Sequence, residues 1–235
     1  MEDYTMDAFT SWLGQLNLSV VWNYVVIVAS SLLCIMFHEV SHGYVALKLG
    51  DTTARDAGRL TFNPIKHIDI WGLLMMAIFR FGWAKPVPID MRNFKHPVRD
   101  MAITAAAGPI SNVILAFLAL CIRAAAVYVY QRTGGVISDF LITFFEYTAV
   151  LSIGLAVFNV IPIPPLDGSK VLNALLPQNV YYQILRYERY GFLIMMLVLW
   201  TGILDVPLDF CRSGLLSLLG KGAVFPYYIL KAIFG

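Results

Sequence analysis

Two histidines and a glutamate form the most informative short pattern of the chain, His38-Glu39-Val40-Ser41-His42. Residues four apart on a helix share one face, with Cβ atoms about 6 Å apart, so both imidazoles could bind one metal ion. Glu39 stands beside them and could take a proton from an activated water molecule. Two of the four histidines in the chain therefore flank a glutamate inside an apolar segment, where ionisable groups are costly and usually functional. This pattern predicts a hydrolytic site with one Zn²⁺ per chain.

A catalytic zinc site needs a third protein ligand and one open position. The helix that follows His42 offers no further His or Glu, and the best distant candidate is Asp167. This aspartate follows a proline-rich stretch, residues 162–165, and precedes Gly168. Such a sequence forces irregular backbone at the end of an apolar segment and presents a carboxylate there. An ordinary surface turn would have the same sequence, so at this point both interpretations of Asp167 stay open.

The composition indicates a membrane protein. Hydrophobic residues make up 59% of the chain and charged residues 14%, with a mean hydropathy of +0.70, whereas soluble domains carry about 25% charged residues. We therefore expect an all-α polytopic protein embedded in a lipid bilayer. The lysines and arginines form no basic stripe interleaved with aromatic residues, so no nucleic-acid partner is expected. Three distant cysteines without a CxxC pair argue against cysteine ligation of zinc and against a disulfide framework.

The apolar stretches predict a single domain over residues 1–235 with about four or five transmembrane helices. The predicted spans are residues 20–49, 101–130, 136–161 and 190–206, of which the second and third are joined by a short glycine turn. Residues 70–79 are apolar but too short to cross, so we expect a re-entrant or buried segment there. Residues 20–176 form the expected core, and residues 177–235 an interfacial segment with one or more C-terminal helices.

Loop charges predict an orientation. Lysine and arginine gather in residues 48–69, 80–100 and 166–189, whereas residues 1–19 have none and residues 131–136 have only Arg132. The positive-inside rule then places the N terminus outside and the charged loops in the cytoplasm, with the active site nearer the cytoplasmic side.

Residue counting along the spans predicts which polar groups lie at the level of the metal. His38 lies ten residues before Lys48, and Asn112 lies twelve residues after Asp100, which places them about 15 and 18 Å below the same surface. Asn112, together with Asn159, is therefore a candidate for hydrogen-bonding a substrate or a developing oxyanion. A structural hydrogen bond between helices is the equal alternative for each asparagine.

Two further ionisable residues, Arg123 and Glu146, fall in the second and third predicted spans. Counted from Tyr130 and Val136, both lie roughly 10–15 Å from the opposite surface. Because a charge at that depth needs a partner, we expect these two side chains to pair far from the metal site.

With these motifs in hand, the chain resembles the site-2 protease family of intramembrane zinc metalloproteases, in its compact branch without a PDZ domain. The resemblance covers residues 37–176 and includes HExxH, the NxxPxxxLDG pattern of residues 159–168, and the stretches 58–64, 83–89, 107–112 and 158–162. It implies that His38, His42 and Asp167 bind Zn²⁺ and that Glu39 is the general base. Single-span membrane proteins would then be the substrates.

The segment 83–90 could hold such a substrate. Pro86 and Pro88 remove donors from one edge of an extended strand, whereas Lys85, Val87 and Ile89 keep theirs on the other edge. That edge could add the substrate as a strand through main-chain hydrogen bonds. The resemblance implies a re-entrant β-hairpin near residues 70–90; a plain proline-rich surface loop is the alternative.

Two other functions remain possible on the sequence alone. A prenyl-protein processing enzyme with HExxH would need a glutamate as third ligand, and the late glutamates Glu146 and Glu188 have no neighbouring motif. A zinc transporter or sensor would have no use for Glu39 as a base. The sequence specifies no oligomeric state.

Overall fold

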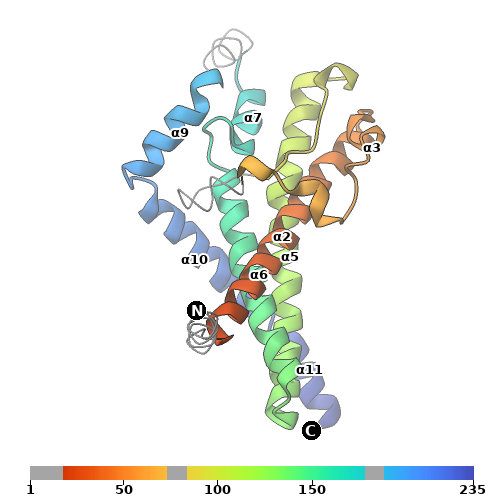
Figure 1. Ribbon diagram of the computed structural model, residues 1–235, viewed down its shortest axis with the longest axis vertical. Helices are drawn as coiled ribbons and strands as arrows, with labels where there is room; N and C mark the ends of the chain where they lie inside the picture. Colours follow the sequence, from red (N-terminus) through yellow and green to blue (C-terminus); the bar gives the residue numbers. More distant parts are fainter. Residues whose placement is uncertain (1–17, 73–83, 178–187) are drawn as a thin grey trace, which may run out of the picture.

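Three long helices form the frame of the protein, as Figure 1 shows. The computed structural model describes residues 18–72, 84–177 and 188–235. The long helices are α2 (Leu18–Lys48), α5 (Pro97–Thr133) and α6 (Val136–Asn159), and each is apolar and long enough to cross a membrane. The three spans predicted over residues 20–49, 101–130 and 136–161 are therefore confirmed, with shifts of a few residues at their ends.

Helices α5 and α6 form a tight antiparallel hairpin. Gly134 closes α5 with a left-handed φ of 59° and donates its N–H to the carbonyl of Tyr130, as is usual at a helix C terminus. Alanines form most of the buried contact between the two helices, in a cluster of Ala116, Ala119, Ala149 and Ile153. Small residues of this kind let apolar helices approach closely in a membrane.

Helix α2 crosses this hairpin obliquely (Figure 1) and is fixed to α6 by small polar side chains. The Ser30 hydroxyl donates to the carbonyl of Phe144 over 3.2 Å, and the Cys34 thiol lies 3.4 Å from the carbonyl of Thr148. These contacts set the height of α2 against α6, and so the height at which the HExxH residues meet the other helices.

Short elements gather beyond the C-terminal end of α2. They are α3 (Thr53–Asp56), η1 (Pro64–His67) and η2 (Met91–Asn93). Asp51 ties this region together, because its buried carboxylate accepts hydrogen bonds from the Asn93 amide and from the backbone N–H groups of Thr53 and Asp90. Burial raises the pKa of Asp51, but the Thr53 hydroxyl, which also donates to this carboxylate, and the other donors hold that pKa below its ordinary value.

The expected β-hairpin is described only in part. Residues 84–90 have no regular secondary structure, and residues 73–83, which include most of the predicted re-entrant segment, lie outside the described part of the chain.

After α6 the chain turns sharply into the short helix α7 (Asp167–Ala174). Residues 160–166 between them are irregular, as their prolines predict. Gly168 permits the turn, because a Cβ there would lie 2.0 Å from the carbonyl oxygen of Val160. The turn brings Asp167, the first residue of α7, back towards α2.

The C-terminal region corrects one prediction. Residues 190–206 do not form one span: η3 (Glu188–Tyr190) and α9 (Gly191–Trp200) are followed by a break, then by α10 (Asp205–Gly222) and α11 (Phe225–Phe234). The chain bends by 87° at this break, where Gly202 adopts a left-handed φ of 68°. If the bent pair counts as one broken span, the described residues hold four candidate spans, and otherwise three.

The predicted ion pair between α5 and α6 is confirmed. The Nε of Arg123 lies 3.2 Å from a carboxylate oxygen of Glu146. Counting residues from the helix ends was sufficient to match the two charges, because both helices are straight enough for depth to follow residue number.

Candidate metal centre

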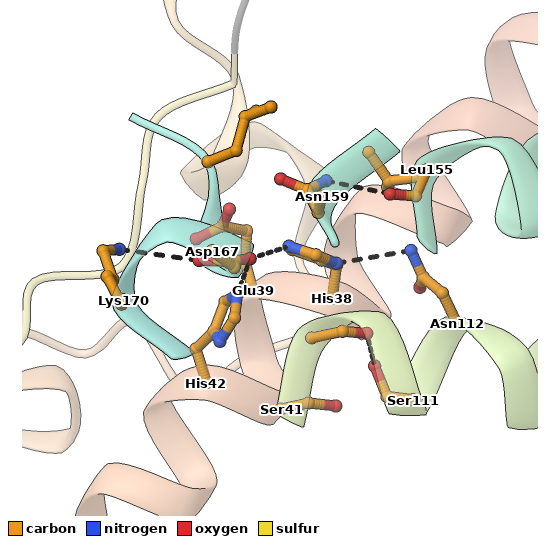
Figure 2. A network of polar contacts seen from close by, with 12 residues as sticks. His38, Glu39, Ser41, His42, Ser111, Asn112, Leu155, Asn159, Asp167 and Lys170 are labelled. Carbon is orange, nitrogen blue, oxygen red and sulfur yellow. Dashed lines mark hydrogen bonds and ion pairs between the residues drawn. The ribbon is translucent and has the colours of Figure 1, made fainter. Parts of the chain in front are cut away.

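Three side chains from two distant parts of the chain converge beside α5, as Figure 2 shows. The Nε2 atoms of His38 and His42, on α2, each lie 3.1 Å from the same carboxylate oxygen of Asp167, on α7. All three residues are buried, and their ligand atoms lie within 4.8 Å of one another. Two ligand atoms at 2.0–2.1 Å from a tetrahedral zinc ion would stand about 3.4 Å apart. The spacing and the donor set therefore fit one zinc ion.

The far nitrogens of the two imidazoles are held by α5. The Nδ1 of His42 lies 2.7 Å from the backbone carbonyl of Thr104, and the Nδ1 of His38 lies 3.3 Å from the side-chain amide of Asn112. A carbonyl beside Nδ1 fixes the proton on that nitrogen and leaves Nε2 free to bind a metal. The structure thus brings Asn112 to the level of the HExxH residues, as predicted, and places it against His38.

Gly108 provides the room that both imidazoles occupy. A Cβ at this position would lie 2.4 Å from Nε2 of His42 and 2.6 Å from Cε1 of His38. No L-amino acid with a side chain fits there without displacing both rings. The two imidazoles therefore occupy a space that is open only because α5 carries glycine at this point.

Asp167 is positioned by its own helix as well as by the histidines. Lys170, one turn later on α7, places its ammonium 3.5 Å from the second carboxylate oxygen. Burial raises the pKa of the Asp167 carboxyl, but without a metal ion a protonated Nε2 on His38 or His42, together with the charge of Lys170, holds that pKa below its usual range. The side chain is therefore the anion that a metal ion requires.

Glu39 faces a different partner from its neighbours. One of its carboxylate oxygens accepts a hydrogen bond of 2.8 Å from the backbone N–H of Val87. Val87 itself is buried, and it packs so closely on α2 that a Cβ added at Gly43 would lie 3.0 Å from its side chain. The catalytic candidate is thus in contact with the proline-containing segment 84–90, which we call the strap.

The strap is anchored at both ends. The Lys85 N–H donates to the carbonyl of His67 over 2.9 Å, and the Lys85 carbonyl accepts from the guanidinium of Arg59 over 2.8 Å. At the other end, the Asp90 N–H donates to Asp51 over 2.8 Å. The donors of Lys85 and Val87, two of the three predicted to hold a substrate, are therefore paired within the chain in this conformation.

Comparisons with known proteins agree with this geometry. The sequence model of peptidase family M50 matches residues 26–201. The chain belongs to peptidase family M50. Over 164 residues, it is 38% identical to YwhC of Bacillus subtilis (strain 168), covering 70% of this chain and 75% of that protein. Over 192 residues, it is 28% identical to Rip2 of Mycolicibacterium smegmatis, covering 80% of this chain and 71% of that protein. The names of both relatives describe zinc metalloproteases. No solved structure matches the chain.

Membership of family M50 confirms the resemblance to site-2 proteases and makes this chain a membrane zinc metalloprotease. The catalytic candidates also face a cavity of about 630 Å³ that a substrate could enter. His38 and Glu39 of α2, Asn159 of α6 and Met195 of α9 line it together with the strap residue Ala84. Asn159 donates to its own helix, to the Leu155 carbonyl over 3.0 Å, and still borders the cavity, whereas Asn112 is fully buried behind His38.

Three contacts of this M50 site escaped the sequence interpretation. Lys170 had a usable signal, because position i+3 on a helix returns to the same face as Asp167. The contact between Thr104 and His42 uses a backbone carbonyl, and the contact between Val87 and Glu39 uses a backbone N–H. Neither is encoded in a residue type, so no local pattern could have indicated them. The third residue predicted to hold a substrate, Ile89, lies in the strap, and its side chain is partly buried.

Proposed function

We propose that this M50 protease hydrolyses peptide bonds of transmembrane substrates within or next to the bilayer. His38, His42 and Asp167 would hold one zinc ion per chain, and Glu39 would act as the general base. The observation that carries the proposal is the convergence of the three ligand atoms beside a cavity among apolar helices, which His38 and Glu39 both line.

The residues of the chain have separable roles in this reaction. When bound, zinc supplies a Lewis acid that polarises the scissile carbonyl and lowers the pKa of water towards neutrality. Glu39 takes the proton from the attacking water and gives it to the departing amine. Asn159, on the cavity wall, is placed to hydrogen-bond the substrate beside the reacting carbonyl.

The strap links substrate binding to the state of Glu39. The Val87 N–H has one hydrogen and can donate either to Glu39 or to a substrate carbonyl. If the substrate adds to the strap as a strand along the edge of Lys85, Val87 and Ile89, where the Lys85 N–H stays on His67 as an anchor, it withdraws the Val87 donor from Glu39 and frees the carboxylate to accept a proton. The base would then become active only when a substrate is in place.

The proposed substrates are single-span membrane proteins, and the proposed orientation places the strap end of the molecule in the cytoplasm. Lysine and arginine lie mainly at this end, near α3, the strap and the start of α5. The zinc site would then lie about 15 Å below the cytoplasmic surface, since His38 is ten residues before Lys48 on α2.

One experiment with three variants tests the function. The purified protein is assayed for zinc content and for cleavage of a panel of single-span substrates. Wild type is expected to hold one zinc ion and to cleave. Glu39→Gln should keep its zinc and lose about 10²–10⁴-fold in rate, because it removes only the base. A zinc transporter or sensor would not depend on this carboxylate.

Asp167→Ala should lose metal and activity together, since it removes a ligand. Asp139→Ala is the matched control, because Asp139 is an exposed aspartate in the first turn of α6, at the far end of the hairpin. Full zinc occupancy and activity in Asp167→Ala would show that the third ligand is misassigned. An active Glu39→Gln would remove Glu39 as the base.

A further inference from the structure

A second hollow adjoins the catalytic cavity and extends it along the helices. It has a volume of about 380 Å³ and lies between α2 and α6. It shares Ile35, Leu155 and Phe158 with the catalytic cavity, so the two hollows are direct neighbours, and we call the second hollow the α2–α6 groove. Its walls are almost wholly apolar, with Cys34, Val150 and Gly154 among the lining residues.

One charged residue lines this groove. Arg212, on α10, borders the hollow together with Ser31 of α2 and Gly154 of α6, neither of which lines the catalytic cavity. Ser31 lies eleven residues from Val20 and seventeen from Lys48, the two ends of its span. At 1.5 Å per residue, the hollow that Arg212 lines therefore reaches a point about 17 Å from one end of α2 and about 25 Å from the other. Charged residues at such depth are rare and commonly functional.

The contacts of Arg212 do not explain its position structurally. Its ion pair with Asp209, at 2.9 Å, joins two residues one turn apart on the same helix. This ion pair therefore does not join two helices, whereas the ion pair of Arg123 and Glu146 joins α5 to α6. The Arg212 side chain is 50% exposed, and a guanidinium has five N–H donors. Among the described residues, the ion pair with Asp209 occupies one nitrogen of Arg212, so other N–H donors of this residue, which lines the hollow, remain for a ligand.

We propose that the α2–α6 groove holds the part of the substrate's transmembrane segment that leads away from the scissile bond, and that Arg212 recognises an acceptor side chain there, a carboxylate or an amide. This inference rests on the proposed function and adds a specificity determinant to it. An apolar groove fits the apolar residues of such a segment. A guanidinium in low-dielectric surroundings favours an acceptor over an aliphatic side chain at one position.

The geometry predicts where that acceptor lies. From His38 to Ser31 is seven residues of helix, or about 10 Å. A substrate extended for cleavage advances about 3.3 Å per residue. The acceptor should therefore lie three or four residues from the cleaved bond, on the side that points away from the strap. If the segment remains helical in the groove, the same distance corresponds to about seven residues.

The test scans one aspartate through a cleavable transmembrane substrate and compares each position with leucine. Wild type should cleave the aspartate form about tenfold faster than the leucine form at one position, three to four or about seven residues from the bond. Arg212→Met should bring that ratio close to one. Arg212→Glu should reverse the preference, favouring lysine at the same position. Zinc content shows that each variant is folded, and Arg212→Ala, which also removes the charge, replaces Arg212→Met if the latter fails to hold zinc.

Arg55→Met is the matched control, because Arg55 also pairs with a neighbouring aspartate but lies on α3, far from the groove. It should leave the ratio at its wild-type value. A flat scan in wild type, or a preference that persists in Arg212→Met, would overturn the role of Arg212 while cleavage itself upholds the protease. Failure of the zinc-loaded wild type to cleave any substrate would instead count against the proposed function.

Discussion

At the scale of single residues, the two ligand histidines differ in what holds their outer nitrogens. His42 faces a backbone carbonyl, that of Thr104, which can only accept. His38 faces the amide of Asn112, whose carbonyl oxygen is buried without a partner among the described residues. When Nε2 binds a metal ion, Nδ1 carries the proton and needs an acceptor. A half-turn of the amide would bring that carbonyl to His38, so metal binding should select this orientation.

We therefore predict that Asn112 positions His38 for metal binding. Asn112→Leu, of similar size, should lower the affinity for zinc by about 10–100-fold, as loss of an outer partner of a ligand histidine commonly does. Asn112→Asp retains an acceptor and should bind zinc close to the wild-type affinity. Competition with a chromophoric chelator measures both. Unchanged affinity in Asn112→Leu would return Asn112 to the alternative of a bond between helices.

Much of this site could be predicted from the sequence because it depends on position along helices. The spacing of HExxH places His38 and His42 on one face, and depth counting places Asn112 at their level. Counting does not say which way a side chain turns, so the sequence left Asn112 between substrate binding and a structural role. The structure distinguishes the two asparagines by burial: Asn112 is fully enclosed, whereas Asn159 borders the cavity, and the role of each stays a prediction.

At the scale of elements, the structure changed our interpretation of the strap more than that of any other segment. The alternation of Pro86 and Pro88 predicted a substrate edge on Lys85, Val87 and Ile89. The structure pairs the first two donors within the chain, with His67 and Glu39. Their direction depends on tertiary anchors such as Asp51 and Arg59, which lie dozens of residues away in sequence. No local pattern carries that information.

Exchange of the Val87 donor between Glu39 and substrate leads to a prediction. Val87→Pro removes this N–H, so the substrate loses a main-chain hydrogen bond beside the scissile carbonyl. Cleavage of a transmembrane substrate should fall about tenfold or more, with zinc content unchanged. Pro88→Ala is the matched control, since it alters the neighbouring residue and adds a donor on the opposite edge; its activity should stay close to that of wild type. Equal activity of the two variants, with normal zinc, would remove the strap from substrate binding.

The break between α9 and α10 shows where apolar composition fails as a guide. Residues 190–206 are apolar enough to suggest one span, yet α9 ends at Trp200. The Thr201 hydroxyl donates to the Val198 carbonyl over 2.7 Å, and Gly202 turns the chain through a left-handed conformation. Gly191, at the start of α9, also fits closely against Pro164, where a Cβ would lie 2.5 Å from the proline ring. Helix α9 is thus positioned by the loop of residues 160–166, which leads into Asp167. This position brings Met195 of α9 to the cavity wall.

At the scale of the whole molecule, charge is distributed between two ends. Figure 1 places α3, the start of α5 and α7 at one end, and the turn between α5 and α6 at the other, beside α11. Lys48, Arg59 and Lys95 are among many basic residues near the first end, whereas Arg132 stands at the second with Lys231 of α11. These two basic residues at the second end reduce the difference in positive charge between the two ends without reversing it. The positive-inside rule continues to favour the first end in the cytoplasm.

This orientation can be tested with two cysteine substitutions at exposed sites. Lys95→Cys lies just before α5, at the basic end, and Val136→Cys opens α6 at the opposite end, where Val136 is 85% exposed. A membrane-impermeant maleimide added to intact bacterial cells should label Val136→Cys at once and Lys95→Cys only after lysis, because in the proposed orientation only the turn end faces outward. The unsubstituted protein gives the background from Cys34, Cys121 and Cys211. The opposite labelling order would place the basic end outside, and the metal centre would then be reached from the extracytoplasmic side.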